Sequence, residues 1–181
     1  MKASRLCPLV PFVLAACSSP PHQPLPTVPI VDLKRYSGHW YEIARLPNRF
    51  QHDQSRATAN YTLEPGGKVK VRNTEYRPDG HQKSIEGQAV PVEGSHNARL
   101  RVQFSGLASL AISPAEGNYW IIALEPDYSA ALVGTPDRDY LWLLARSPNF
   151  PPASRDRLIQ RAKALHCPVE KLIVASWPTN P

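Results

Sequence analysis

The sequence predicts an all-β fold, in which eight antiparallel strands close into an up-and-down barrel and one C-terminal helix packs outside it. Apolar and charged residues alternate over 68–72 and 99–104, which is typical of strands with one solvated face. Short Pro, Gly and Asp turn signals separate such segments, and residues 152–165 alone have a helical apolar period. A closed barrel of eight strands exposes no sheet edge and leaves room for one small ligand.

The first 17 residues have the layout of an export signal. A basic segment, residues 1–5, precedes an apolar segment, residues 6–13, that is too short to span a bilayer. Leu14-Ala15-Ala16-Cys17 resembles the bacterial lipoprotein signal, which implies that residues 1–16 are removed and that Cys17 is lipidated. An ordinary secretory signal cut near Ala16 is the alternative.

Residues 17–30 are expected to form a lipidated, proline-rich tether that spaces the folded domain, residues 31–178, from the membrane. Five prolines in this stretch favour an extended, polyproline-like chain without a core. Ser18, and not an aspartate, follows the cysteine. By resemblance to the lipoprotein sorting rule, this implies anchoring in the bacterial outer membrane, with the protein facing the periplasm.

Each element of the barrel follows from the same alternation and turn signals. Turns are predicted at 65–67, 78–80, 93–95, 114–117, 126–127 and 135–137. The strands between them are predicted near 39–46, 56–64, 68–77, 82–92, 98–105, 118–125, 129–134 and 140–146.

A helix is predicted from Pro152 to Leu165, where Leu158, Ile159, Ala162 and Leu165 share one face. Pro152 suits the first helical turn, and Ser154 is an alternative N-cap. The apolar face should lie against the outside of the sheet. Residues 171–175 then read as a short final strand.

Trp40 on the first strand and Arg146 on the last are predicted to stack at the closed end of the barrel. A guanidinium over an indole face contributes about 0.5 to 2 kcal/mol. The pair would hold the two ends of the sheet together.

Charge and motifs argue against several classes of function. The formal charge of +6 falls to +4 once Lys2 and Arg5 leave with the signal peptide, and no basic cluster is interleaved with aromatics, so no nucleic-acid partner is expected. The chain has no nucleophile elbow, zinc-protease motif, phosphate-binding glycine loop or Cys-x-x-Cys. Its six histidines lack ligand spacing, so neither a metal, a cofactor nor catalysis is expected.

Three regions together resemble the lipocalin family. Gly38-His39-Trp40, Pro126-Asp127-Tyr128 and Arg146 have the order and spacing of its three signature regions, with Pro126 where the family often has threonine. Residues 40–45 and 136–142 further resemble the bacterial outer-membrane lipoprotein lipocalins, which are related to apolipoprotein D. The resemblance covers about residues 30–178.

The resemblance implies a barrel open at one end, with Gly38, Trp40 and Arg146 as structural signature residues and a lipophilic ligand inside. The implied function is to bind, store or transport fatty acids, lysophospholipids or similar ligands, in membrane maintenance under stress. A carrier of a cyclic ligand, haem-like or terpenoid, and a structural lipoprotein that binds nothing are the alternatives. Enzymatic lipocalins use a cysteine inside the barrel, and none lies between Cys17 and Cys167.

Alternation from Arg146 places Leu144, Trp142 and Tyr140 on the inner side of the last strand. On the sixth strand we prefer Tyr119 and Ile121 inward, because bacterial relatives carry a tyrosine there. Trp142 and Tyr119 could instead serve core packing. Val69 and Val71 add to the apolar wall, and the predicted ligand-binding residues are Trp142, Tyr119, Ile121, Leu144, Leu100, Val102 and Phe104.

Four polar residues are left with open roles. Arg45 or Arg49 could hold a carboxylate or phosphate head group at the barrel mouth, or both could be solvated cations. Glu42 is expected to be a buried or mouth-lining acid. Cys167 is expected to be a part-buried, unreactive thiol, with a homodimer through it as the weaker alternative.

Overall fold

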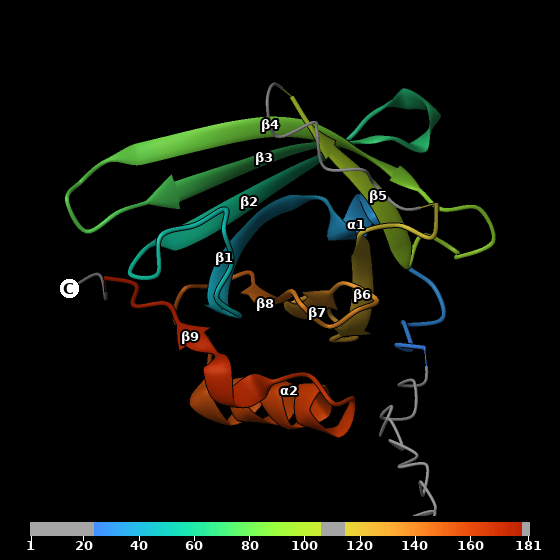
Figure 1. The fold of residues 1–181 in the computed structure, drawn as a ribbon. Coiled ribbons are helices and arrows are strands. Elements are labelled where there is room, and N and C mark those ends of the chain that lie inside the picture. The colour runs from blue at the N-terminus through green and yellow to red at the C-terminus, as the bar shows by residue number, and fades with distance from the viewer. Residues whose placement is uncertain (1–23, 106–114, 179–181) are drawn as a thin grey trace, which may run out of the picture.

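The computed structural model describes residues 24–105 and 115–178, which form one antiparallel sheet closed into a barrel (Figure 1). The signal peptide and the predicted lipidation site, Cys17, lie outside the described residues. Every barrel strand begins and ends within one residue of its predicted bounds. The strands are β1 (Gly38–Arg45), β2 (Arg56–Leu63), β3 (Val69–Tyr76), β4 (Gln82–Pro91), β5 (Arg99–Phe104), β6 (Tyr119–Leu124), β7 (Ala130–Gly134) and β8 (Leu141–Ala145).

Strand β1 closes the barrel by pairing with strands on both of its sides. Its first half pairs with β2, from Gly38 opposite Tyr61 to Tyr41 opposite Thr58. Its second half pairs with β8, and the short strand β9 (Ile173–Val174) adds to it beside Ala44. The predicted eight-stranded barrel is therefore confirmed, with β9 as a ninth strand outside it.

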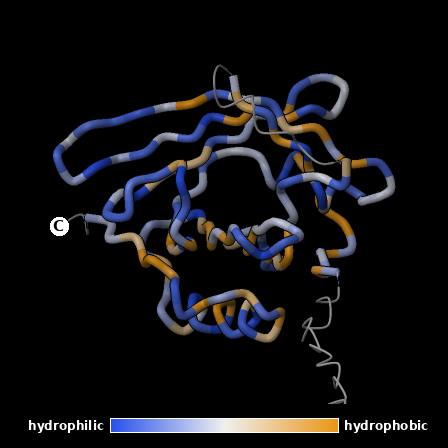
Figure 2. Tube along the Cα trace, viewed as in Figure 1, coloured by the Kyte–Doolittle hydropathy of each residue, from blue (hydrophilic) through white to orange (hydrophobic). Residues whose placement is uncertain are grey.

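Helix α2 (Pro152–Ala164) lies on the outside of the barrel, as predicted (Figure 1). Leu158 and Ala162 are buried there in an apolar cluster that also contains Leu132 and Leu143 of β7 and β8. Pro152 occupies the first turn, and no side chain caps the helix, so Ser154 is not an N-cap. Figure 2 shows hydrophobic segments where β6, β7 and β8 pass between the lumen and α2, whereas the long β3–β4 hairpin is mostly hydrophilic.

A four-residue helix that was not predicted, α1 (Leu33–Tyr36), covers the closed end. The Asp32 side chain caps it by accepting hydrogen bonds from the backbone N–H groups of Lys34 and Arg35. Its one-turn spacing directs Leu33 and Tyr36 into the inner core of the barrel.

Residues 24–30 lie against the barrel and are not a free spacer. Leu25 is buried in the outer apolar cluster with α2, and the Val28 N–H donates to the carbonyl of Ile121 at 2.9 Å. The predicted tether, residues 17–30, therefore includes a segment from Leu25 onward that packs on the barrel, because the apolar Leu25 is buried in the outer cluster.

Candidate functional site

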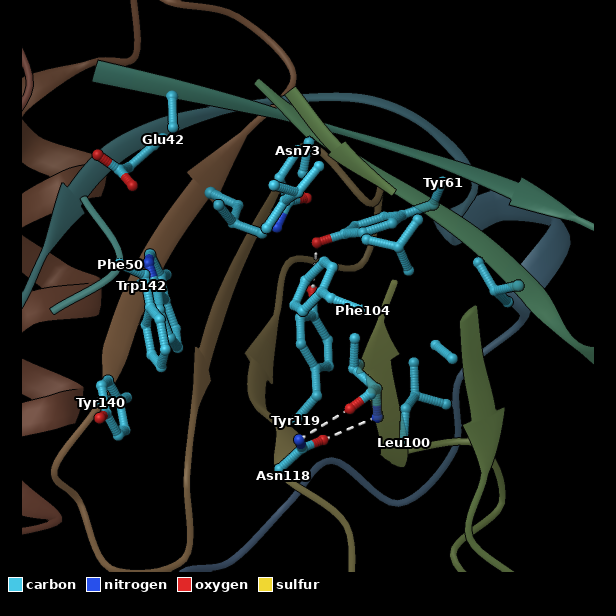
Figure 3. Close-up of a pocket in the computed structure, with 18 of the residues that line it drawn as sticks. Glu42, Phe50, Tyr61, Asn73, Leu100, Phe104, Asn118, Tyr119, Tyr140 and Trp142 are labelled. Carbon is cyan, nitrogen blue, oxygen red and sulfur yellow. Dashed lines mark hydrogen bonds between the residues drawn. The ribbon is translucent and has the colours of Figure 1, made fainter. Parts of the chain in front are cut away.

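The barrel encloses a cavity of about 690 Å³ that is lined mainly by apolar side chains (Figure 3). Its volume falls within the range of about 300 to 1,000 Å³ that is usual for small-molecule sites. The inward residues of β3, β4 and β5 provide a continuous part of the apolar wall: Val69, Val71, Ile85, Ala89, Leu100, Val102 and Phe104.

Six of the seven predicted ligand-binding residues line this cavity: Trp142, Tyr119, Leu144, Leu100, Val102 and Phe104. Ile121 does not. Its side chain faces inward as predicted, but it is fully buried in the inner core that also contains Trp40 and Val133. The predicted face of β6 is correct. Alternation alone does not show which inward residues pack in the core at the closed end and which line the cavity above it.

Asn118 supports this part of the wall by extending the short pairing of β5 with β6. Its side-chain amide donates to the Val102 carbonyl at 3.0 Å and accepts from the Val102 N–H at 2.8 Å (Figure 3). The two bonds take the place of a strand ladder beyond Leu100, the last residue of β5 that pairs with β6. The pattern of polar residues in the sequence does not indicate this role of Asn118.

Arg146 and Trp40 stack at the closed end, as the sequence predicts, with the guanidinium carbon 3.8 Å from the ring centroid. The same guanidinium donates to backbone carbonyls on three segments. Gly38 is required beside it, because its φ is +101° and an added Cβ would lie 3.3 Å from the arginine Nη1. The accepting carbonyls belong to Arg35, Tyr36, Ser37, His39 and Tyr128.

Three cavity-lining tyrosines, Tyr36, Tyr61 and Tyr119, form a cluster above Trp40. The Tyr119 hydroxyl lies 2.7 Å from that of Tyr36 and 3.0 Å from that of Tyr61. The Tyr36 ring stacks on Tyr61 and contacts Trp40, with ring centroids 5.7 and 5.0 Å away. Burial raises the pKa of Tyr61 to about 12 and those of Tyr36 and Tyr119 well above their ordinary value, so all three stay protonated at neutral pH.

A row of three aromatic rings leads from solvent to the cavity. Phe50 is 54% exposed, and its ring centroid lies 5.6 Å from that of Tyr140. Tyr140 in turn stacks on Trp142, with centroids 5.8 Å apart and planes 6° apart. Trp142 Nε1 donates to the Gln51 side chain at 3.3 Å, which ties the innermost ring to the loop after β1.

Arg45 does not hold a head group, which corrects one of the two predicted roles. A β-bulge between Glu42 and Ala44 shifts the register of β1, so that Arg45 pairs with Trp142 of β8 and shares its inward side. The arginine is fully buried, forms an ion pair with Glu42 at 3.3 Å, and donates to the carbonyl of His52 at 2.6 Å. Its role is to hold the loop after β1 against the barrel.

Arg49 remains the candidate cation at the mouth, because it lines the cavity and is exposed. Its guanidinium carbon lies 5.2 Å from the ring of Phe50. Lys83 is a second exposed cation in the lining, so the cavity combines long cationic side chains with exposed aromatic surface.

Glu42 lines the cavity and is 4% exposed. Burial raises its pKa to about 7, against the opposing effects of a 2.8 Å hydrogen bond from Gln51 and the charge of Arg45. Glu75, also buried, accepts from the His52 N–H at 2.7 Å. Gln51 and Glu75 were missed by the sequence analysis, since Gln51 lies in a loop and Glu75 is a polar residue on the inward face of β3.

Cys167 is buried in the outer cluster beneath α2, where desolvation raises the pKa of its thiol. Both effects lower the fraction of reactive thiolate, and an intermolecular disulfide through Cys167 would require local opening. Within residues 24–105 and 115–178, no group of three metal-binding side chains is present. In the same residues, no helix has the length and apolar character needed to cross a bilayer.

Comparison with known proteins agrees with this geometry. The family model described as a lipocalin-like domain matches residues 31–176. The outer membrane lipoprotein Blc of Escherichia coli K12 is 39% identical, covering 96% of this chain and 98% of its own. Rat apolipoprotein D is 39% identical, covering 78% of this chain and 71% of its own. The solved structure of insecticyanin from Manduca sexta superposes with a TM-score of 0.60 at 18% identity, covering 84% of each chain, which shows a shared fold.

Proposed function

Because this chain belongs to the lipocalins, a family that binds small lipophilic ligands, we propose that it holds fatty acids, lysophospholipids or similar single-chain amphiphiles in its barrel. One observation carries the proposal: an apolar cavity of about 690 Å³ above the Trp40 and Arg146 pair. A structural lipoprotein that binds nothing would fill this space with its own side chains.

The acyl chain would occupy the apolar wall of β3, β4 and β5. Removing apolar surface from water contributes about 25 cal/mol per Å², so binding would grow with chain length until the cavity is filled. The head group would stay at the mouth beside Arg49, which is one of two exposed cations in the cavity lining, the other being Lys83. The proposed contacts are Trp142, Tyr119, Leu144, Leu100, Val102 and Phe104.

We place the protein at the outer membrane, anchored through Cys17 and facing the periplasm, where it would store or transport lipids during membrane stress without chemical conversion. Support comes from the leader and from relatives that are named outer membrane lipoproteins. Replacement of Cys17 by Ala should move the protein from the membrane to the soluble fraction. Retention in the membrane would contradict the anchor. Association of two copies is a separate proposal, which sedimentation of the detergent-free chain would test.

The binding proposal is tested with the chain that lacks residues 1–17. This form keeps every contact of the described core, which begins at Leu25. Calorimetric titration with hexadecanoate and with a lysophospholipid should give saturable binding at one site. Trp142→Ala should weaken binding about tenfold, whereas Val174→Ala, an exposed residue on β9, should not. Equal affinity in the two variants would remove Trp142 from the site, and no binding by the parent chain would contradict the function.

A planar cyclic ligand is the second candidate, because Tyr140 and Trp142 present nearly parallel rings at the mouth. The same titration with haem decides between the two classes. Tighter saturable binding of haem than of any acyl lipid would favour the cyclic ligand.

A further inference from the structure

The tyrosine cluster of Tyr36, Tyr61 and Tyr119 contains more hydrogen-bond donors than the protein uses. Each phenol has one O–H hydrogen, so the cluster has three. The structure pairs these hydroxyls in two hydrogen bonds, both to the oxygen of Tyr119, and each bond uses one hydrogen. Whichever way the bonds run, one hydrogen is left without an acceptor among the described residues.

The tyrosines that share the spare hydrogen line the cavity. All three tyrosines belong to its lining, and Figure 3 shows the hydroxyl end of Tyr61 directed toward Tyr119 in the space among the labelled side chains. Leu33, Ala59 and Leu100 also line this region, together with Asn73, whose side-chain Oδ1 is buried without a hydrogen-bond partner (Figure 3). An unmatched donor in such surroundings lowers the free energy of a ligand that places an acceptor there, because the donor would otherwise stay unpaired away from water.

The surroundings also decide what kind of acceptor fits. An ionised carboxylate at this depth would lose its hydration and gain one donor, which costs much more than it returns. Arg146 is no substitute, since its guanidinium stacks against Trp40 and bonds backbone carbonyls. A neutral oxygen, as in a ketone, hydroxyl, ester or ether, needs one donor and brings no charge.

We propose that the tyrosine cluster is a subsite for a neutral oxygen atom on the deep part of the ligand, so that the barrel selects oxygenated acyl chains over plain ones with an equal number of carbons. The inference rests on the proposed lipid binding and refines it. The head group at the mouth and the oxygen at the closed end would then be recognised separately.

The test compares hexadecanoate with a panel of oxo-hexadecanoates that carry one ketone at successive positions in the distal half. Affinities are measured by calorimetry for the parent chain and for a variant with Tyr36, Tyr61 and Tyr119 all replaced by Phe. Removing all the partners of a buried polar group while keeping shape is nearly neutral for folding, which thermal unfolding checks. At one ketone position or more, the ratio of the ketone dissociation constant to that of hexadecanoate should rise about fivefold in the triple variant.

Counting hydrogens gives a second, sharper expectation. Tyr61→Phe removes one hydroxyl and one bond, so one spare hydrogen remains, and this single variant should keep the ketone preference. The variant Tyr41→Phe/Tyr76→Phe, which alters tyrosines outside the cavity lining, should also keep it. The infrared carbonyl band of a bound 13C-labelled ketone should lie at lower frequency in the parent chain than in the triple variant.

The outcomes separate the subsite from the general function. Hexadecanoate binding with an unchanged ketone ratio across the whole panel and an unshifted carbonyl band would overturn the subsite and leave lipid binding intact. Ketone binding without hexadecanoate binding would support the subsite and restrict the ligands of the barrel to oxygenated chains. Failure of every lipid to bind the parent chain would overturn both.

Discussion

At the scale of single residues, Arg146 connects α1, β1 and the turn before β7 through one guanidinium. It stacks on Trp40 and donates to the carbonyls of residues 35–37, of His39 and of Tyr128. A tryptophan and an arginine a hundred residues apart could be paired from the sequence because both are parts of a family signature. The carbonyl contacts could not, because they depend on α1.

Replacement of Arg146 by Ala should lower the free energy of unfolding by about 2 to 4 kcal/mol, since it removes a cation–π contact and several charge-assisted hydrogen bonds. Arg99→Ala is the matched control. Its guanidinium lies 5.2 Å from the ring of Trp120, and its loss should cost less than about 1 kcal/mol. Denaturant unfolding measures both, and equal losses would contradict the special role of Arg146.

Glu42 should make stability depend on pH. Its pKa rises from about 4.5 in the unfolded chain to about 7 in the fold, so its stabilising effect is complete below about pH 4.5 and is lost as pH rises through 7. The free energy of unfolding of the parent should therefore fall by about 3 kcal/mol relative to Glu42→Gln across this window. Glu86→Gln, an exposed partner of Lys70, is the control and should follow the parent. Parallel curves for the parent and Glu42→Gln between pH 4.5 and 8 would refute the expectation.

At the scale of elements, strands were predictable and departures from regularity were not. Alternation in β3 and β5, together with the turn signals between segments, located all eight strands of the barrel. The bulge in β1 reverses parity within one strand, so Arg45 faces inward where unbroken alternation after Trp40 and Glu42 would turn it outward. Helix α1, at four residues, is too short to give a periodic signal.

Helix α2 stabilises the barrel from outside, and changes in its packing should alter stability without altering ligand affinity. Leu158→Ala should lower the free energy of unfolding by about 2 to 5 kcal/mol, because it leaves a void between the helix and the sheet. Gln160→Ala on the exposed face should change it little. Hexadecanoate affinity below the unfolding transition should be the same in both variants and in the parent. A loss of affinity in Leu158→Ala alone would mean that the outer core shapes the cavity.

At the scale of the whole molecule, the fold is a cup with two apolar regions on either side of one sheet. The inner region fills the closed end around Trp40, and the outer region joins β1, β7 and β8 to α2. Inward parity in the sequence identified parts of the cavity wall on β3, β5, β6 and β8, but no residue of β2 or β4. It could not show that the loop residue Gln51 lines the cavity, or that Ile121 lies in the packed core and not in the cavity wall. Both facts depend on how distant segments of the chain pack together.

The central claim is that the lumen is empty enough to take an acyl chain, and filling it tests that claim most directly. Val102 lines the cavity, whereas Val90 on the neighbouring strand β4 is 37% exposed and outside the lining. Hexadecanoate should bind the parent and Val90→Trp with equal affinity and should fail to bind Val102→Trp, with cooperative unfolding in all three. Parent-like binding by a folded Val102→Trp would contradict a ligand site in the barrel.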